Sequence, residues 1–204
     1  FVYSAYGNFG SSRVEGNLHQ RWNPAYYHFI VDGSCQPTDL NQWMPSWWKG
    51  IWVDFNFTQD IPLGSFEIKG IWGENSTEAH TSGKVDSKDF SFRDMEFKNS
   101  AIEVSVDYNN TLVNCIELTH EEGTISGSLK FPRRNSQSPY FLELEFNGDY
   151  PLEKGRNVLG ETIKSQISEL NASLIDCEVK GKIGRSDTSN PDHEIEIKIS
   201  SAED

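Results

Sequence analysis

A chain of 204 residues that is 36% hydrophobic, 12% aromatic and 24% charged has the composition of a folded protein, which excludes wholesale disorder. Its formal charge of −13 at pH 7 disfavours nucleic acid and anionic lipid as partners. No apolar run reaches the roughly 20 residues that a membrane span requires. The length fits one domain over residues 1–204, with residues 1–48 predicted to be an N-terminal extension that packs on the main body.

Two segments in the first third of the chain are predicted strands without a fully polar face. Residues 26–32 read YYHFIVD and residues 50–57 read GIWVDFNF, so aromatic and β-branched side chains predominate in both. Because each segment has apolar or aromatic side chains at both sets of alternating positions, we expect both faces of each strand to contact other parts of the protein.

From residue 66 onward, alternation with a period of two residues is the dominant signal. In residues 101–108, for example, Val104 faces one way and Glu103 the other. A slip of this alternation before residue 97 predicts a bulge or a turn at Arg93-Asp94. Further strands with one apolar face are predicted over residues 66–72, 112–118, 123–131, 140–146, 174–183 and 193–199.

Short turns between successive strands predict antiparallel neighbours, so the fold class is all-β. One apolar face per strand is typical of both a closed barrel and a β-sandwich or jelly roll, and both remain open. One amphipathic helix is predicted over residues 156–172, where Val158, Ile163 and Ile167 recur at helical spacing.

The triplet Gly50-Ile51-Trp52 matches the G-x-W signature that opens the first barrel strand of lipocalins and the wider calycin group. A meander of strands, a helix and a last strand follow, and Asn147-Gly148-Asp149-Tyr150 is similar to a second motif of the group. The chain departs from the pattern in its long segment before Gly50 and in lacking an Arg after the helix. The resemblance implies an antiparallel lipocalin-like barrel that binds a small apolar ligand, a scaffold that some relatives use for cyclisation or isomerisation.

A candidate pocket combines Tyr26 and His28 with Trp52 and Asp54. The aromatic side chains would supply apolar contact area, and the pair of His28 and Asp54 would exchange protons near neutral pH. The alternative is that the N-terminal residues simply cover these strands. A glycan on Asn56 would separate the two interpretations, because strand parity would then turn Trp52 and Asp54 outward.

Tryptophans gather around Pro45, and the candidates for ligand contact among them are Trp43, Trp47, Trp48 and Trp52. Such a cluster can stack on a flat ligand or a sugar ring, or it can close one end of a barrel. The histidines are scattered without metal-ligand spacing, and the sequence contains no phosphate loop and no nucleophile motif. We therefore expect no metal site and no cofactor.

The leading functional hypothesis is a β-barrel that binds a small hydrophobic or aromatic molecule. The second is a cofactor-independent cyclase or isomerase on the same scaffold, with His28 and Asp54 as catalytic residues, and the third is a secreted carbohydrate-binding module that uses Trp47 and Trp48. If the Asn-x-Ser/Thr sites at Asn56, Asn75, Asn109 and Asn171 are used, the protein is a secreted glycoprotein. The sequence leaves the oligomeric state and the redox state of Cys35, Cys115 and Cys177 open.

Overall fold

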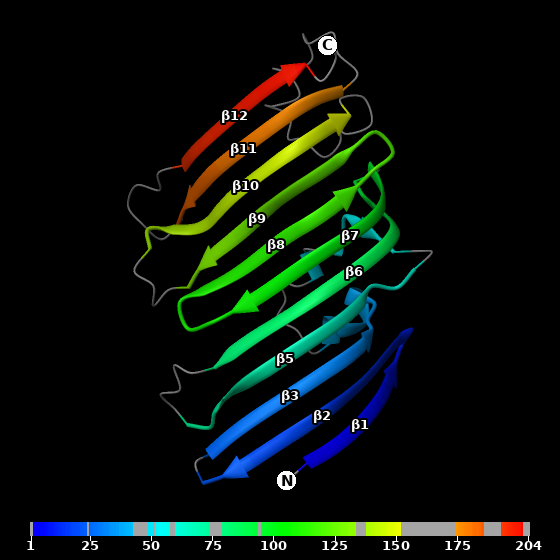
Figure 1. Cartoon of the computed structure of the whole chain (residues 1–204), viewed down its shortest axis with the longest axis vertical. Coiled ribbons are helices and arrows are strands. Elements are labelled where there is room, and N and C mark those ends of the chain that lie inside the picture. Colours follow the sequence, from blue (N-terminus) through cyan, green and yellow to red (C-terminus); the bar gives the residue numbers. More distant parts are fainter. Residues whose placement is uncertain are drawn as a thin grey trace.

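The computed structural model of the chain describes residues 2–23, 25–42, 49–50, 52–57, 60–73, 79–93, 95–133, 138–151, 174–185 and 193–201. Most of these residues belong to a single antiparallel sheet (Figure 1). The strands are β1 (Val2–Phe9), β2 (Ser12–Trp22), β3 (Ala25–Ser34), β4 (Phe55–Asn56), β5 (Leu63–Ile71), β6 (His80–Phe92), β7 (Met95–Val106), β8 (Asn110–Thr119), β9 (Thr124–Pro132), β10 (Tyr140–Pro151), β11 (Leu174–Gly184) and β12 (His193–Ser201).

Apart from the short β4, the sheet is a meander in which each strand pairs with the next one along the chain. The order is β1-β2-β3-β5-β6-β7-β8-β9-β10-β11-β12, and the short β4 pairs with β6 beside this path. The prediction of an all-β protein with antiparallel strands is therefore confirmed. The first three strands, in the segment predicted to be an extension, are hydrogen-bonded members of the same sheet.

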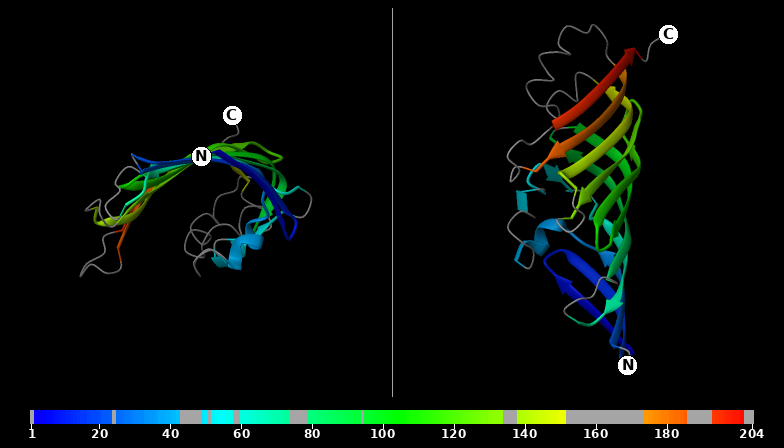
Figure 2. Two further views of the ribbon diagram at one scale, coloured as in Figure 1. Left: turned by 90° about the horizontal axis from the view of Figure 1, so that it is seen from below. Right: turned by 90° about the vertical axis from the view of Figure 1, so that its left-hand side faces the viewer.

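Closure into a barrel is not seen among the described strands, because β1 and β12 form two separate edges of one open sheet (Figures 1 and 2). Period-two alternation reports which side of each strand is apolar, whereas closure depends on how far the sheet curls. The predicted helix over residues 156–172 lies outside the described residues.

Strand register divides the sheet into an apolar and a polar face, since residues directly opposite each other on neighbouring strands project to the same side. A central apolar ladder crosses the whole path and consists of Ala5, Gly16, Val31, Phe66, Gly83, Val104, Val113, Leu129, Leu144, Gly181 and Ile195. The adjacent ladder, which is offset by one residue on every strand, lies on the other face and is polar apart from its first member. It consists of Tyr6, Glu15, Asp32, Ser65, Lys84, Glu103, Asn114, Ser128, Glu145, Lys180 and Glu196.

The sheet curves, and its apolar face lies on the concave side. Figure 2 shows the short 3-10 helix η1 (Pro37–Gln42) and the β4 segment inside the curve. Phe55 and Phe57 from this segment pack on Phe90 of β6, which belongs to the apolar side. A bulge in β8 contributes to the bend, because Ile116 and Glu117 together lie opposite a single residue of each neighbouring strand.

The hydrophobic core sits at one end of strands β6 and β7. Its buried members are Phe90, Met95 and Phe97, and the aromatic rings of Phe90 and Phe97 stack with centroids 5.2 Å apart. The alternation of β6 shifts by one residue near its end, because Asp89 adopts a φ of 44°. The buried side chains Ser87 and Phe90 are therefore three residues apart, where regular alternation would separate them by two. The predicted turn is confirmed at Arg93, which follows β6 with a φ of 47°.

Hydrogen bonds to Asp39 hold η1 against the turn between β1 and β2. The Asp39 carboxylate accepts hydrogen bonds from the Ser11 and Ser12 amides at 2.9 and 3.2 Å and from the Ser12 hydroxyl at 2.8 Å. These hydrogen bonds lower the pKa of Asp39, with the Ser12 hydroxyl as the largest cause. Gly10 turns the chain here with a φ of 58°, and a Cβ at this position would meet the Asp39 carboxylate.

Candidate functional site on the concave face

The concave side of the sheet carries apolar ladders that no second sheet covers within the described chain. The ladder on one side of the central one includes Leu18, Phe29, Ile68, Thr81, Val106, Thr111 and Phe131. The ladder on the other side includes Val14, Gly33, Gly64, Val85 and Ile102, and it continues through Gly127, Phe146, Val179 and Ile197. None of these positions holds Asp, Glu, Lys or Arg, so these ladders offer no charge to a polar ligand.

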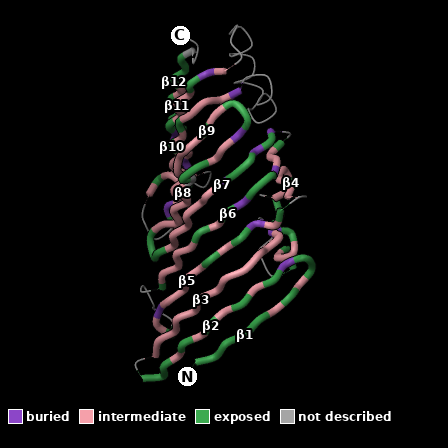
Figure 3. Tube along the Cα trace, turned by 45° about the vertical axis from the view of Figure 1, so that its right-hand side comes forward, coloured by how far each residue is buried: buried purple, intermediate pink, exposed green. Residues whose placement is uncertain are grey.

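The side chains of the central ladder are mostly half-buried, although their composition is that of a protein core. Phe66, Val104 and Leu129 keep part of their surface exposed, and Ile195 on the edge strand is 58% exposed. Partial burial extends along the whole of β3 (Figure 3). The buried hydrophobic residues of the described part, in contrast, number four: Phe90, Met95, Phe97 and Ile175. An apolar surface of this extent that stays in contact with water favours a partner that covers it.

Glycines on the apolar face allow aromatic rings to lie flat across neighbouring strands. The Phe66 ring lies over Gly83, where a Cβ would overlap the nearest ring carbons. Phe146 covers Gly127 in the same way. Glycines inside strands mark such close approaches, so these two glycines are a signal in the sequence from which the aromatic contacts could have been predicted.

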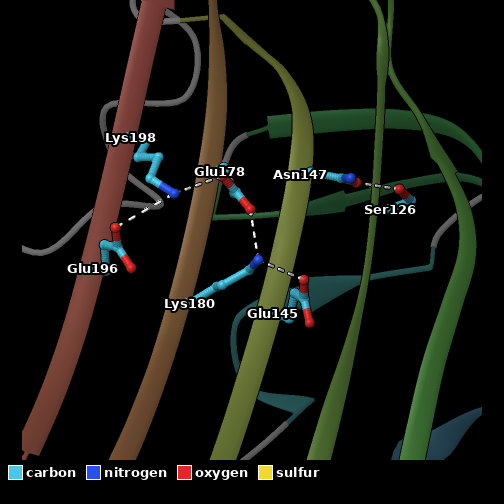
Figure 4. A network of polar contacts seen from close by, with 7 residues as sticks. All are labelled: Ser126, Glu145, Asn147, Glu178, Lys180, Glu196 and Lys198. Carbon is cyan, nitrogen blue, oxygen red and sulfur yellow. Dashed lines mark hydrogen bonds and ion pairs between the residues drawn. The ribbon is translucent and has the colours of Figure 1, made fainter.

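Charged side chains on the opposite, convex face form ion pairs both across neighbouring strands and along one strand (Figure 4). Lys180 lies 3.1 Å from Glu145 and 2.7 Å from Glu178, and Lys198 lies 3.4 Å from both Glu178 and Glu196. The hydrogen bond to Glu178, followed by that to Glu145, raises the pKa of Lys180 to about 12. The convex face is thus adapted to water, which leaves the concave face as the apolar surface of the sheet.

Tyr26 and His28 lie on the convex face of β3. The register places His28 opposite His19 and Lys69, and its Nε2 lies 2.8 Å from Oε1 of Glu67. Lys69, and to a smaller extent His28, lowers the pKa of Glu67. The carboxylate beside His28 is therefore Glu67 and not Asp54.

Trp52 and Asp54 lie elsewhere, so the structure does not assemble the predicted pocket. Among the described residues of the segment 50–57, Phe55 and Asn56 alone are in a strand, and residues 49, 50 and 52 are helical. Trp52 packs on Phe55 with centroids 5.3 Å apart, while Asp54 accepts a 2.6 Å hydrogen bond from Nε of Arg93. The period-two alternation of a strand does not apply to a helical turn. The prediction that Trp52, Asp54 and Asn56 project to one side of a single strand is therefore wrong.

The structure also bears on the predicted tryptophan cluster, glycosylation sites, cysteines and metal ligands. Trp43, Trp47 and Trp48 lie outside the described residues, as do the possible glycosylation sites at Asn75 and Asn171. Asn56 and Asn109 are exposed. Cys35 and Cys177 are half-buried free thiols, and burial raises the pKa of both. In the part of the chain that the structure covers, no group of three His, Cys, Asp or Glu side chains is arranged to hold a metal ion.

The fold and its two faces define the class of this protein as an open, curved antiparallel meander with one apolar face. No family model, no curated protein and no solved structure matches the chain. Among the helices that the structure describes, none is long and apolar enough to cross a bilayer. Functional inference therefore depends on the chemistry of the sheet itself.

Proposed function

We propose that the chain binds an elongated hydrocarbon ligand, such as an acyl or alkyl chain, along the apolar face of its sheet. The observation that carries the proposal is the central apolar ladder, which crosses eleven strands without a charged side chain and stays partly exposed to water. At a strand spacing of about 4.8 Å, ten steps give this ladder a length of roughly 48 Å. A long apolar strip suits a long apolar molecule better than a compact one.

Contact with hydrocarbon is the interaction that this surface can supply. Covering apolar area releases water and stabilises the complex by about 25 cal/mol for each Å². Hydrogen-bonding groups for a sugar or a charged ligand are absent from the central ladder, since its members are Ala, Gly, Val, Phe, Leu and Ile. This composition supports a hydrocarbon ligand and argues against a carbohydrate on this face.

The test is a chain-length series of uncharged alcohols, from octanol to dodecanol, that compete with a fluorescent apolar probe. Full burial of one methylene contributes about 0.8 kcal/mol. A ligand that lies on an open face buries roughly half of each methylene, so affinity should rise about twofold per carbon. Affinity that does not change with chain length would contradict the proposal.

Two neighbouring residues of β7 provide a matched pair of variants. Val104 lies on the apolar face and Ser105 on the polar face, and both are half-buried. Val104→Glu should weaken dodecanol binding about tenfold or more, because the carboxylate would lose water when the ligand covers it. Ser105→Glu should change it less than about twofold. Circular dichroism checks the fold, and Val104→Thr, which keeps the size and β-propensity of the side chain, replaces Val104→Glu if that variant unfolds. Equal weakening by both glutamate variants would place the ligand elsewhere.

The other functions predicted from the sequence receive less support. A cofactor-independent cyclase or isomerase depended on His28 and Asp54 as one acid–base pair, and these residues have different partners, Glu67 and Arg93. A carbohydrate site on Trp47 and Trp48 stays a prediction, because both residues are outside the described part of the chain.

A further inference from the structure

The convex face carries a histidine-rich corner beside the turn between β2 and β3. One cross-strand row runs from His19 on β2 through His28 on β3 and Lys69 on β5 to His80 on β6. Three of the five histidines of the chain lie in this row. The imidazole centroids of His19 and His28 are 5.9 Å apart, so both rings can contact one small ligand.

A hollow of about 630 Å³ opens at this corner. Its walls include Val2, His19, Arg21, Tyr26, His28 and Ile71, which come from β1, β2, β3 and β5. The Tyr26 and His28 rings are tilted against each other with centroids 6.4 Å apart. The hollow thus combines nitrogen donors with an apolar and aromatic wall.

Among the described residues, the charge of this corner is opposite to that of the whole chain. None of the described residues that line the hollow is acidic. Arg21 forms no ion pair with any residue that the structure describes, whereas Lys84 and Lys130, which lie further along the same face, each pair with a glutamate. The nearest carboxylate of the neighbouring row, Glu67, already contacts His28 at 2.8 Å and Lys69 at 3.4 Å. Among the described residues around the hollow, Arg21 and Lys69 against Glu67 leave one positive charge in excess, in a chain whose formal charge is −13.

We propose that this hollow binds a small organic anion in which a phosphate or carboxylate group is attached to an aromatic or short apolar body. Arg21 binds the oxyanion, because a guanidinium presents paired hydrogen-bond donors that match two oxygens of a phosphate or carboxylate. His19 adds a further donor, and its positive charge when protonated. Tyr26, Val2 and Ile71 contact the apolar body. The site is independent of the proposed hydrocarbon site, since it lies on the other face of the sheet.

A protonated imidazole carries a positive charge and donates through both ring nitrogens, so His19 and His28 strengthen an anion site whenever they are protonated. The charged or titratable groups that face them from the packed strands are Arg21 on β2, Tyr26 on β3, Glu67 and Lys69 on β5, and His80 on β6. Described residues of β1 add only Val2 and Ser4 near this corner.

The experiment is an NMR titration of the histidine ring signals with phenyl phosphate, and with phenol and inorganic phosphate as separate probes. Phenyl phosphate should shift the signals of His19 and His28 at pH 6. The signal of His120, which is buried and bonded to the Asp149 carbonyl at 2.8 Å, should stay in place. Phenol and phosphate should each bind about tenfold more weakly, because each lacks one half of the contacts.

Arg21→Gln should weaken phenyl phosphate about tenfold, since a hydrogen bond to a charged group contributes about 1.5–3 kcal/mol. The matched control is Arg13→Gln, because Arg13 lies on the same face of β2 outside the hollow and should be neutral in effect. Equal weakening by the two variants, or equal shifts of His19 and His120, would show unspecific attraction and overturn the proposal. Hydrocarbon binding on the concave face should be unchanged in Arg21→Gln, which separates the two proposals.

Discussion

Ile175 and Ile195 offer a direct comparison between the core and the open part of the apolar side. Ile175 on β11 is 3% exposed, and Ile195 on β12 is 58% exposed. Changing either residue to Ala removes three carbons, which for a buried side chain costs about 2.4 kcal/mol of transfer free energy at 0.8 kcal/mol per carbon. A cavity adds to this cost at Ile175, so we expect Ile175→Ala to lower the free energy of unfolding by about 3–4 kcal/mol.

Ile195→Ala should cost much less. With 58% of its surface exposed, Ile195 buries a little under half of its side chain, which corresponds to about 1 kcal/mol. Solvent or a neighbouring side chain fills the space, so no closed cavity forms. Urea denaturation of both variants measures the difference. Equal losses of stability would mean that Ile195 is covered in the folded protein, and would refute the view that the ladder reaches the edge strand as an open surface.

Two further predictions concern how the sheet is held in shape. Gly83→Val places a Cβ against the Phe66 ring and should lower the free energy of unfolding by about 1–3 kcal/mol. Phe66→Ala in the double variant should restore part of this lost stability. Thermal unfolding measures the single and the double variant, and a Gly83→Val variant as stable as the unchanged chain would disprove the close contact. The lowered pKa of Asp39 means that its ionised form stabilises the fold above the ordinary aspartate pKa of about 4, and that this contribution disappears as the pH falls further through the folded-state pKa. Asp39→Asn should therefore lose less stability than the unchanged chain between pH 6 and pH 2.5, and identical pH profiles would exclude this role.

The alternating strands could be predicted from the sequence because side-chain direction in a strand has a period of two. Alternation alone assigns Val104 and Leu129 to the apolar side of their strands, and the register places both in the central ladder. The same signal does not predict the first two strands. In β2, the glycine at the inward position 16 conceals the alternation, because the apolar surface there is provided by its neighbour Val31.

Pairings between distant residues could not be predicted. The sequence pattern groups His28 with Asp54 in one candidate pocket, but the chain around Trp52 forms a helical turn and Glu67 on β5 reaches the imidazole instead. Which carboxylate meets a histidine depends on strand order and register, and these are set by long-range hydrogen bonds that leave little trace in a local pattern.

Antiparallel strands with one apolar and one polar side follow from the residue pattern, because that property belongs to each strand separately. That the strands form one open, curved sheet, and that its concave side stays partly exposed to water, is seen in the folded protein and not in the pattern. The physical reason is that curvature and closure arise from twist, bulges and glycine contacts summed over many strands, and the same alternation is compatible with a barrel, a sandwich or an open sheet.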